Sequence, residues 1–304
     1  MSNVKFSRSE SPNIIFLVRR EMMDKERIIH RICALHETCP GNIVTEKEAI
    51  SPELIGLNIF GEPLVGFASA TDELFEAFKN SDIVGPWFLS PTEWLPEAKT
   101  VISLFFPYTE AVKSANRKAT THPAAEWLHG RIEGQAYLLK LIESLKKWFD
   151  DNDIKTCVPI TDQRFEVVVA GNNFKQYSCV TADTFSSNWS ERHVAYIAGL
   201  GTFGLSKGLI TEKGMAGRFI SIIVSKELAA DPRPYTGIYD HCNRCGACVK
   251  RCPAQAISLA EGKDHNLCGA WLSKMGNLFK PRYGCGLCQT GVPCESAIPR
   301  KRRT

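Results

Sequence analysis

The clearest pattern in the chain is a series of hydrophobic positions at helical spacing between residues 124 and 150. The apolar side chains in this series are Trp127, Leu128, Ile132, Leu138, Leu141, Ile142, Leu145 and Trp148. Because they recur every three or four positions, they predict a long amphipathic helix over 124–150. Gly130 and Gly134 interrupt the series and indicate either a kink or the close approach of a neighbouring segment.

Shorter patterns predict strands and further helices. We expect strands at 64–67, 99–106, 165–169 and 219–224, and helices at 21–33, 72–80 and 191–198. The run 99–106, KTVISLFF, is almost continuously apolar and is ended by Pro107, which is typical of a strand buried on both faces. Thr71 or Asp72 is the expected N-cap of the helix over 72–80. This mixture indicates an α+β fold.

The order of the elements suggests two domains. Strands alternate with helices up to about residue 230, and Asp231-Pro-Arg-Pro-Tyr235 then has the composition of a linker. We therefore expect an α/β domain over 1–230, with 1–50 as a less regular N-terminal extension, and a second domain over 231–304. The length of 304 residues suits two domains, and the hydrophobic content of 44% is ordinary for a globular protein.

Charge and targeting signals exclude some classes of protein. The net charge of +4 does not indicate a nucleic-acid binder, and the basic tail Arg300–Arg303 is interpreted as a solvated terminus. The apolar run Asn13–Val18 is too short to span a bilayer. Arg19 and Arg20 follow this run, whereas a twin-arginine export signal would place them before it. We expect a cytoplasmic protein with no membrane partner.

The strongest chemical signal is a set of eight cysteines among the last residues. They are Cys242, Cys245, Cys248, Cys252, Cys268, Cys285, Cys288 and Cys294. The first four form the run C-x-x-C-x-x-C-x-x-x-C-P, which has the bacterial ferredoxin spacing. In that spacing three cysteines hold one [4Fe–4S] cluster and the fourth binds the other cluster. The eight cysteines therefore predict two [4Fe–4S] clusters and a role in electron transfer.

This order suggests a pairing of the ligands, although the spacing of the last four cysteines is less regular than that of the first four. We expect one cluster on Cys242, Cys245, Cys248 and Cys294, and the other on Cys252, Cys268, Cys285 and Cys288. Zinc also binds C-x-x-C pairs, but a four-cysteine run that ends in Cys-Pro is not a zinc pattern. A disulfide framework is disfavoured because no secretory signal is visible. Cys33, Cys39, Cys157 and Cys179 match no site and are interpreted as ordinary thiols.

The middle of the chain contains weaker signals. The string 199–204, GLGTFG, matches the G-x-G-x-x-G dinucleotide pattern, but a helical stretch precedes it and no long helix follows it. We interpret it as a glycine-rich turn where the backbone passes close to a bulky group. From the residues alone, Asp183 is favoured as a helix N-cap, and a catalytic role is the alternative. His193 has no metal-ligand spacing, and His241 is expected to shield or tune the cluster beside Cys242.

The order of these motifs resembles the epoxyqueuosine reductases, which are cobalamin-dependent tRNA-modifying enzymes with two [4Fe–4S] clusters. The matching stretches are LVGFASA (64–70), LPEAKTVISLFFPY (95–108), TADT (181–184), SERHVAYIAGLG (190–201), GLITEKGMAGRFISIIV (208–224), CNRCGACVKRCPAQAI (242–257) and YGCGLCQTGVPCE (283–295). They span roughly residues 60–300, and the cysteine section is the most specific of them. The resemblance extends in outline to reductive dehalogenases.

This resemblance implies a fold, cofactors and site residues. The implied fold is a nitroreductase-like α/β sandwich domain fused to a C-terminal ferredoxin-like module with two [4Fe–4S] clusters. The implied catalytic acid is Asp183, in the position of the family's V-D-T-G motif, and cobalamin is the implied cofactor. Further cofactor contacts are implied at Thr184, Arg192, Gly201, Gly204 and Ser206. The implied partners are an electron donor such as ferredoxin or flavodoxin and a small or modified-nucleoside substrate, with tRNA as a further possibility.

The chain departs from the family pattern in ways that indicate a sibling subfamily. The family's G-K-N is replaced by Gly204-Leu205-Ser206, and the final C-x-x-V-C-P is replaced by CQTGVPCE. No match is found to the helical-repeat tail with which some members bind tRNA. Two other functions stay open: an electron-transfer protein that reduces a corrinoid or flavin on a partner, and a flavin-bound reductase on the same scaffold.

Overall fold

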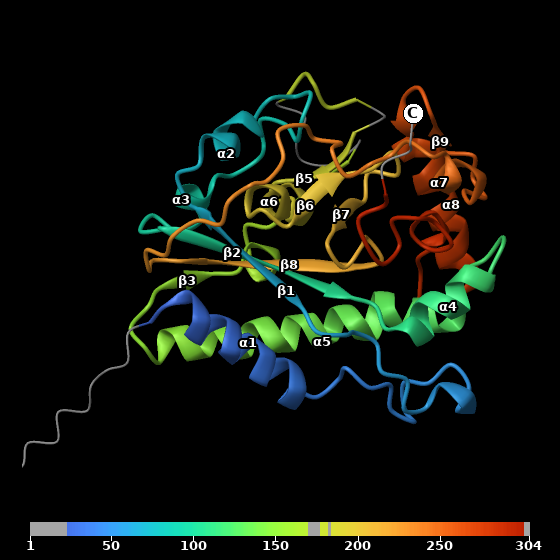
Figure 1. Ribbon diagram of the computed structural model, residues 1–304, viewed down its shortest axis with the longest axis horizontal. Helices are drawn as coiled ribbons and strands as arrows, with labels where there is room; N and C mark the ends of the chain where they lie inside the picture. Colours follow the sequence, from blue (N-terminus) through green and yellow to red (C-terminus); the bar gives the residue numbers. More distant parts are fainter. Residues whose placement is uncertain (1–22, 170–176, 182–183, 301–304) are drawn as a thin grey trace, which may run out of the picture.

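The fold is described from a computed structural model, which describes residues 23–169, 177–181 and 184–300. A central antiparallel sheet is covered by helices below and by shorter elements above (Figure 1). The strands of this sheet have the order β1-β2-β8-β3. Their bounds are Leu64–Ser69 for β1, Thr100–Pro107 for β2, Thr156–Cys157 for β3 and Gly217–Val224 for β8.

The sheet is built around β2, whose eight residues are all buried. It pairs with β1 from Leu64↔Phe105 to Ser69↔Thr100 and with β8 from Thr100↔Val224 to Pro107↔Gly217. The prediction of a strand buried on both faces is therefore confirmed, and so are the strands expected at 64–67 and 219–224. The predicted strand 165–169 is present as β4 (Val167–Val169), but it pairs with β5 (Phe185–Ser187) outside the central sheet.

One face of the sheet packs on two helices, α1 (Lys25–Thr38) and α5 (Ala125–Asp150). The apolar series predicted over 124–150 supplies the core-facing side of α5, including Leu138, Leu141 and Leu145, which are fully buried. Gly130 lies against the ring of Tyr108, and a Cβ added there would be 2.5 Å from that ring. The interruption by glycine thus reflects close approach, which was one of the two expected causes.

The other face packs on a second core of aromatic and small side chains contributed by α2 (Glu73–Ala77), α3 (Pro91–Trp94) and α6 (Glu191–Ile197). Within it, the Trp189 ring stacks on Phe75 and Phe88 with interplanar angles of 11° and 8°. Asp72 caps α2 by accepting a hydrogen bond from the Leu74 N–H, as predicted. The helix expected at 21–33 begins and ends later, because Asp24 caps it through the Arg27 N–H.

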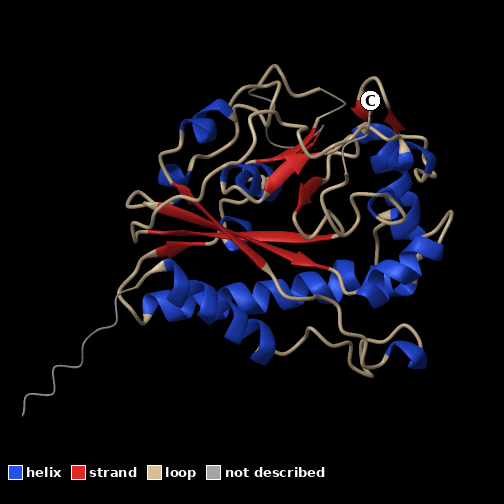
Figure 2. Ribbon diagram, in the orientation of Figure 1, coloured by secondary structure: helices blue, strands red, loops and turns tan. Residues whose placement is uncertain are grey.

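Shorter elements complete the chain, and most of them were not predicted. They are α4 (Glu110–Lys118), β6 (Gly201–Phe203), β7 (Leu209–Thr211), α7 (Ala247–Lys250), β9 (Ile257–Ser258), β10 (Gly262–Lys263), α8 (His265–Leu278) and the 3-10 turns Pro52–Leu54, Pro159–Thr161 and Leu287–Gln289. The elements from α7 onward gather beside α4 and the N-terminal half of α5 (Figure 2). No helix in the described ranges is both long and apolar enough to cross a membrane.

The segment predicted as a linker is fixed to the rest of the protein. Asp231 pairs with Lys25 and accepts a hydrogen bond from the Phe67 N–H. Arg233 pairs with Asp72, and the Tyr235 hydroxyl donates to the Tyr196 carbonyl at 2.6 Å. Its charged and aromatic side chains therefore hold this segment against β1 and α6, which its proline-rich composition did not reveal.

Candidate functional site

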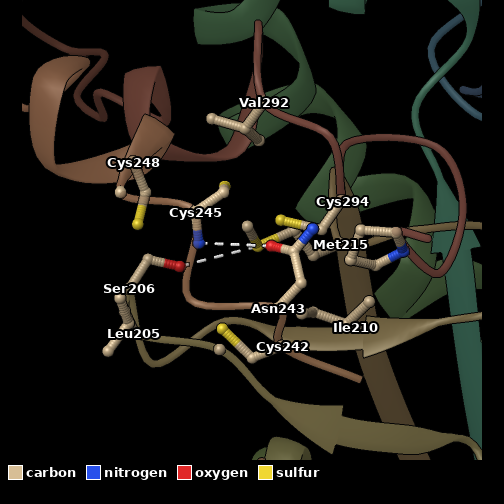
Figure 3. Close-up of a pocket in the computed structure, with 13 residues that line it drawn as sticks. Leu205, Ser206, Ile210, Met215, Cys242, Asn243, Cys245, Cys248, Val292 and Cys294 are labelled. Atoms are coloured by element: carbon tan, nitrogen blue, oxygen red, sulfur yellow. Dashed lines mark hydrogen bonds between the residues drawn. The ribbon is translucent and has the colours of Figure 1, made fainter. Parts of the chain in front are cut away.

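The first group of predicted ligands surrounds one cavity. Cys242, Cys245, Cys248 and Cys294 line it together (Figure 3). Apolar side chains complete the wall, among them Ile210 and Met215. The structure thus brings Cys294 to three cysteines that lie 46 or more positions before it in the chain.

Local backbone geometry explains how the cysteine run wraps this cavity. The Asn243 side chain accepts a hydrogen bond from the Cys245 N–H at 3.2 Å, which tightens the first spacer. Gly246 has a φ of 75°, a left-handed conformation that favours glycine, and it begins α7, which carries Cys248. Pro253 follows Cys252 and prevents the helix from continuing with a regular hydrogen bond.

The second group of predicted ligands also converges. Burial, with smaller contributions from the charges of Cys288, Cys268 and Cys252, raises the pKa of the Cys285 thiol to about 12. Charges act on each other in this way only at short range in a partly buried site, so these four thiols are neighbours. Cys252 follows α7, Cys268 lies on α8, Cys285 precedes the 3-10 turn Leu287–Gln289 and Cys288 lies in it.

Burial disfavours free thiolates in both groups of cysteines. Burial also raises the pKa of Cys248 to about 11 and that of Cys294 to about 12, so a bare thiolate is disfavoured here. No group of three or more His, Cys, Asp or Glu side chains in the described ranges is close enough to hold a single ion. A [4Fe–4S] cubane is bound by four cysteines, and each of the two groups contains four.

A network of hydrogen bonds fastens the cysteine loops to α4. Arg251 donates to the Asn116 and Ala119 carbonyls at 2.9 Å each and to the Thr290 carbonyl at 3.0 Å. The buried Asn116 amide donates to the Cys285 carbonyl and to the Thr290 hydroxyl. These bonds hold the turn that carries Cys285 and Cys288 at a fixed position on the helix.

The glycine-rich string lies on the hairpin of β6 and β7, after α6. A Cβ at Gly201 would be 2.0 Å from the Ile210 carbonyl oxygen, so this position requires glycine. The dinucleotide interpretation therefore fails, as expected, because the required strand–turn–helix context is absent. Gly204 and Ser206 line the same cavity as Cys242, Cys245, Cys248 and Cys294.

The remaining predicted site residues are only partly described. Asp183 lies outside the described residues. Thr184 is described, and its hydroxyl accepts a hydrogen bond from the Thr181 N–H at 2.9 Å. Arg192, in the first turn of α6, donates to the Lys207 carbonyl at 2.8 Å. Burial lowers the pKa of Arg192, and the charges of Cys288 and Cys268 counter this, so Arg192 adjoins the second cysteine group.

Sequence reasoning missed other residues near this group. Lys207, Lys263 and Arg192 surround His265, and together with burial they lower its pKa to about 4. The Phe185 ring stacks on His265 with a centroid distance of 6.1 Å, although Phe185 itself is 61% exposed. Arg192 was among the implied cofactor contacts, but no motif marked Phe185, Lys207, Lys263 or His265, because they come from separate segments that only the tertiary fold brings together.

The comparisons with known proteins agree with the cysteine geometry. Residues 235–258 match the family model "4Fe-4S binding domain". The chain is 25% identical over 237 residues to an epoxyqueuosine reductase of Synechocystis, which covers 70% of each chain. It is 30% identical over 112 residues to a tetrachloroethene reductive dehalogenase of Desulfitobacterium hafniense, which covers 34% of this chain and 20% of that protein.

Solved structures of epoxyqueuosine reductases are also similar to this chain, at lower sequence identity. An epoxyqueuosine reductase bound to an epoxyqueuosine-modified tRNA stem loop has a TM-score of 0.48 and 20% identity, and the match covers 78% of this chain and 62% of that one. Against the reductive dehalogenase, the present chain spans a fifth of the relative's length.

The chain is therefore an oxidoreductase of the iron–sulfur class, since its relatives are reductases and it contains a matched [4Fe–4S] segment. The resemblance expected from its motifs is confirmed: its curated relatives are epoxyqueuosine reductases and, over shorter stretches, reductive dehalogenases. The mixed α and β architecture with a ferredoxin-like segment is also confirmed.

Proposed function

We propose that this protein is a cobalamin-dependent reductase that receives electrons through two [4Fe–4S] clusters. The observation that carries the proposal is the arrangement of the cysteines in two groups, the second of which adjoins the cationic side chains around Arg192. Such a reductase needs a cluster that delivers electrons next to polar side chains able to bind a cofactor or substrate. Residues 231–304 would carry the electrons, and residues 1–230, on a nitroreductase-like scaffold, would hold cofactor and substrate.

The two clusters would be held by the groups already described. Cys242, Cys245, Cys248 and Cys294 would hold one, and the apolar wall around them would keep water away from it. Cys252, Cys268, Cys285 and Cys288 would hold the other. The Cys252 sulfur also accepts a hydrogen bond from the Ala256 N–H at 3.3 Å, and such bonds help set the reduction potential of a cluster.

The residues beside the second group fit a large flat cofactor. Phe185, whose ring stacks on His265, exposes 61% of its surface, and Leu267, two residues after His265 in the chain, exposes 50%; the charge of Lys207 acts on His265. An exposed aromatic and aliphatic surface next to buried cations suits a corrin ring with its amide side chains. When bound, cobalamin would supply a low-valent metal able to reduce an organic substrate. Thr184 and Arg192 are the proposed contacts from the sequence motif.

Asp183 is the proposed proton donor of the reaction. Thr181 and Thr184 flank it in the chain and are hydrogen-bonded to each other. A carboxylic acid that donates a proton near neutral pH needs a raised pKa, which desolvation beside a bound cofactor would provide. The substrate would be a small molecule or a modified nucleoside, as the name of the epoxyqueuosine reductases indicates for those relatives, and the electron donor a ferredoxin or flavodoxin.

Metal and cofactor content tests this proposal directly. The full chain would be produced with added cobalamin, purified without oxygen, and analysed for iron, cobalt and flavin. Near eight irons per chain, two cubanes of four, with stoichiometric cobalt is the expected result. Complementation of a strain that lacks epoxyqueuosine reductase then tests that substrate. Eight irons with neither cobalt nor flavin would refute the reductase and favour an electron carrier. Four irons or fewer would refute the second cluster.

A further inference from the structure

The chain that lines the cavity of the first cysteine group is itself at the surface of the protein. Asn243 and Pro299 belong to the wall of this cavity (Figure 3). Their neighbours in the chain are exposed: Arg244 follows Asn243, and Ile298 and Arg300 flank Pro299. A partner protein that contacts these exposed side chains would therefore lie next to the first cysteine group.

Hydrogen bonds and packing join these residues into one continuous face. The Asn243 amide donates to the Arg300 carbonyl at 3.1 Å, and the Arg244 guanidinium donates to the Leu259 carbonyl. A Cβ added at Gly246 would lie 3.6 Å from the Leu259 side chain. Leu259 directly follows β9, which packs on α7 beside the cysteine run (Figure 1).

This face presents large apolar side chains to solvent. Leu259, Tyr239 and Ile298 expose 51%, 43% and 40% of their surfaces. Tyr239 belongs to the same face because its carbonyl accepts a hydrogen bond from the Cys242 N–H at 2.8 Å. Apolar and aromatic side chains next to arginine are typical of a protein–protein interface. We call this surface the entry face, and its members are Tyr239, Arg244, Leu259, Ile298 and Arg300.

Positive charge is concentrated in the same part of the sequence. Residues 231–304 contain twelve Lys or Arg and five Asp or Glu, whereas residues 1–230 contain 25 and 28. Three of the five acids have local roles: Asp231 and Glu295 form ion pairs, and Asp264 caps α8. Bound clusters would offset part of the excess from inside the fold, but a partner meets the exposed charges first.

The two arginines of the entry face have no carboxylate partner. Neither Arg244 nor Arg300 forms an ion pair with another residue in the described part of the chain, and the Arg300 side chain is exposed. Asp240 is the acid nearest to Arg244 in the chain, and its carboxylate accepts the N–H groups of Thr236 and Gly237. Both guanidinium groups are therefore available to an acidic partner.

We infer that the entry face is the docking surface on which an acidic ferredoxin delivers electrons to the first cysteine group. Ferredoxins carry single electrons at low potential, and opposite surface charges steer such a carrier to its partner. Redox partners also need only a small interface. One electron would leave the reduced ferredoxin and enter an oxidised cluster held by the first cysteine group; no bond forms or breaks, and no proton moves. This inference rests on the proposed function, through its first cluster, and adds where electrons enter.

The rate of cluster reduction by a reduced acidic ferredoxin tests the inference. Stopped-flow absorbance would follow this rate in the anaerobically purified, iron-loaded full chain. Arg244→Glu and Arg300→Glu should each slow it by about tenfold or more at low ionic strength, because electrostatic steering changes association rates by about 10- to 1,000-fold. At about 1 M salt, where charges are screened beyond about 3 Å, the difference from the wild type should disappear. Leu259→Gln should slow reduction at both ionic strengths, since it removes apolar contact area rather than charge.

Lys99→Glu is the matched control for the reversal of charge. Lys99 is exposed, and its N–H donates to the carbonyl of Val224 at the end of β8. Met215, just before the start of β8, donates to the Cys294 carbonyl instead. Lys99 and the first cysteine group therefore lie at opposite ends of this strand, and Lys99→Glu should keep the wild-type rate.

A small reductant separates docking from damage to the cluster. Reduced methyl viologen is a cation and needs no docking surface, so it should reduce Arg244→Glu and Arg300→Glu at least as fast as the wild type. Iron content equal to that of the wild type establishes that each variant is intact. Slower reduction by methyl viologen as well would place the effect in the cluster and overturn the inference.

Three other outcomes are decisive. Equal ferredoxin rates in the wild type and both arginine variants, or an equal loss in Lys99→Glu, would show that the entry face is not the docking surface. If the arginine variants lose retention of an RNA stem loop while their ferredoxin rate is unchanged, the face binds nucleic acid and the inference is wrong. A chain that contains no cobalt but shows the expected ferredoxin rates would refute the proposed reductase and leave the docking surface standing.

Discussion

Arg251 offers the sharpest test of how the cysteine loops are held. Its guanidinium donates to the carbonyls of Asn116, Ala119 and Thr290 at 2.9–3.0 Å. Two of these carbonyls end α4, where the helix leaves its acceptors unsatisfied and a cation is favoured. Arg251 stands between Cys248 and Cys252 in the chain, so one side chain connects both cysteine groups to the helix.

Replacement of Arg251 by Met removes these bonds and leaves the carbonyls without their donor. A single hydrogen bond to a charged group is worth about 1.5–3 kcal/mol, and the bonds are not additive, so we expect a loss of about 3 kcal/mol in the free energy of unfolding. At about 2–4 °C per kcal/mol for a chain of this size, the apparent Tm should fall by about 6–12 °C. Iron bound by the second cysteine group should become more easily lost to a chelator.

The assay is thermal unfolding of the iron-loaded protein without oxygen, followed by circular dichroism, together with the rate of iron release to a chelator. Arg251→Lys keeps a charge near the same carbonyls and should lose about half as much stability as Arg251→Met. Lys250→Met changes the exposed neighbour on the same short helix and is the matched control. A Tm of Arg251→Met equal to that of Lys250→Met would refute the idea that this side chain fastens the loops.

Three further predictions follow from other parts of the structure. Asp183→Asn should abolish turnover and leave iron and cobalt content unchanged; any substantial residual kcat would remove Asp183 from the role of proton donor. His193 is half-buried beside Phe78, and burial, with the charge of Arg192, lowers its pKa to about 3. Below pH 6.5 this histidine is protonated in the unfolded chain but not in the folded one, so the free energy of unfolding should fall by about 1.4 kcal/mol per pH unit. Urea titrations between pH 7 and 5 should show a weaker dependence on pH in His193→Gln than in the wild type. Gly286 has a φ of 64° and a Cβ there would be 1.9 Å from the Trp127 ring, whereas a Cβ at Gly269 meets nothing within 4 Å. Gly286→Ala should thus lose about half of the iron, one cubane of two, while Gly269→Ala keeps all of it; equal iron content in the two variants would contradict this.

Several features of the protein were readable from the sequence alone. The helix over 124–150 and the strand over 99–106 were predicted because the side chains of an element repeat with the period of its own backbone. The ferredoxin-type segment was predicted for a similar reason, since the short spacers of the Cys242–Cys252 run encode a local loop geometry, and the family model matches it. The sequence could not decide between a kink and a close approach at Gly130, because the answer depends on the Tyr108 ring, which the fold places against this glycine.

Other features depend on contacts between distant segments, which local periodicity does not report. The sequence order suggested that Cys294 joins Cys242, Cys245 and Cys248, but it is the fold that brings all four to one cavity. The grouping of Lys207, Lys263 and His265 with Arg192 had no sequence signal, because these residues lie on separate segments. Local spacing thus determined the main helix and strands and the metal chemistry of this chain, whereas tertiary packing decided which charged side chains lie beside the second cysteine group.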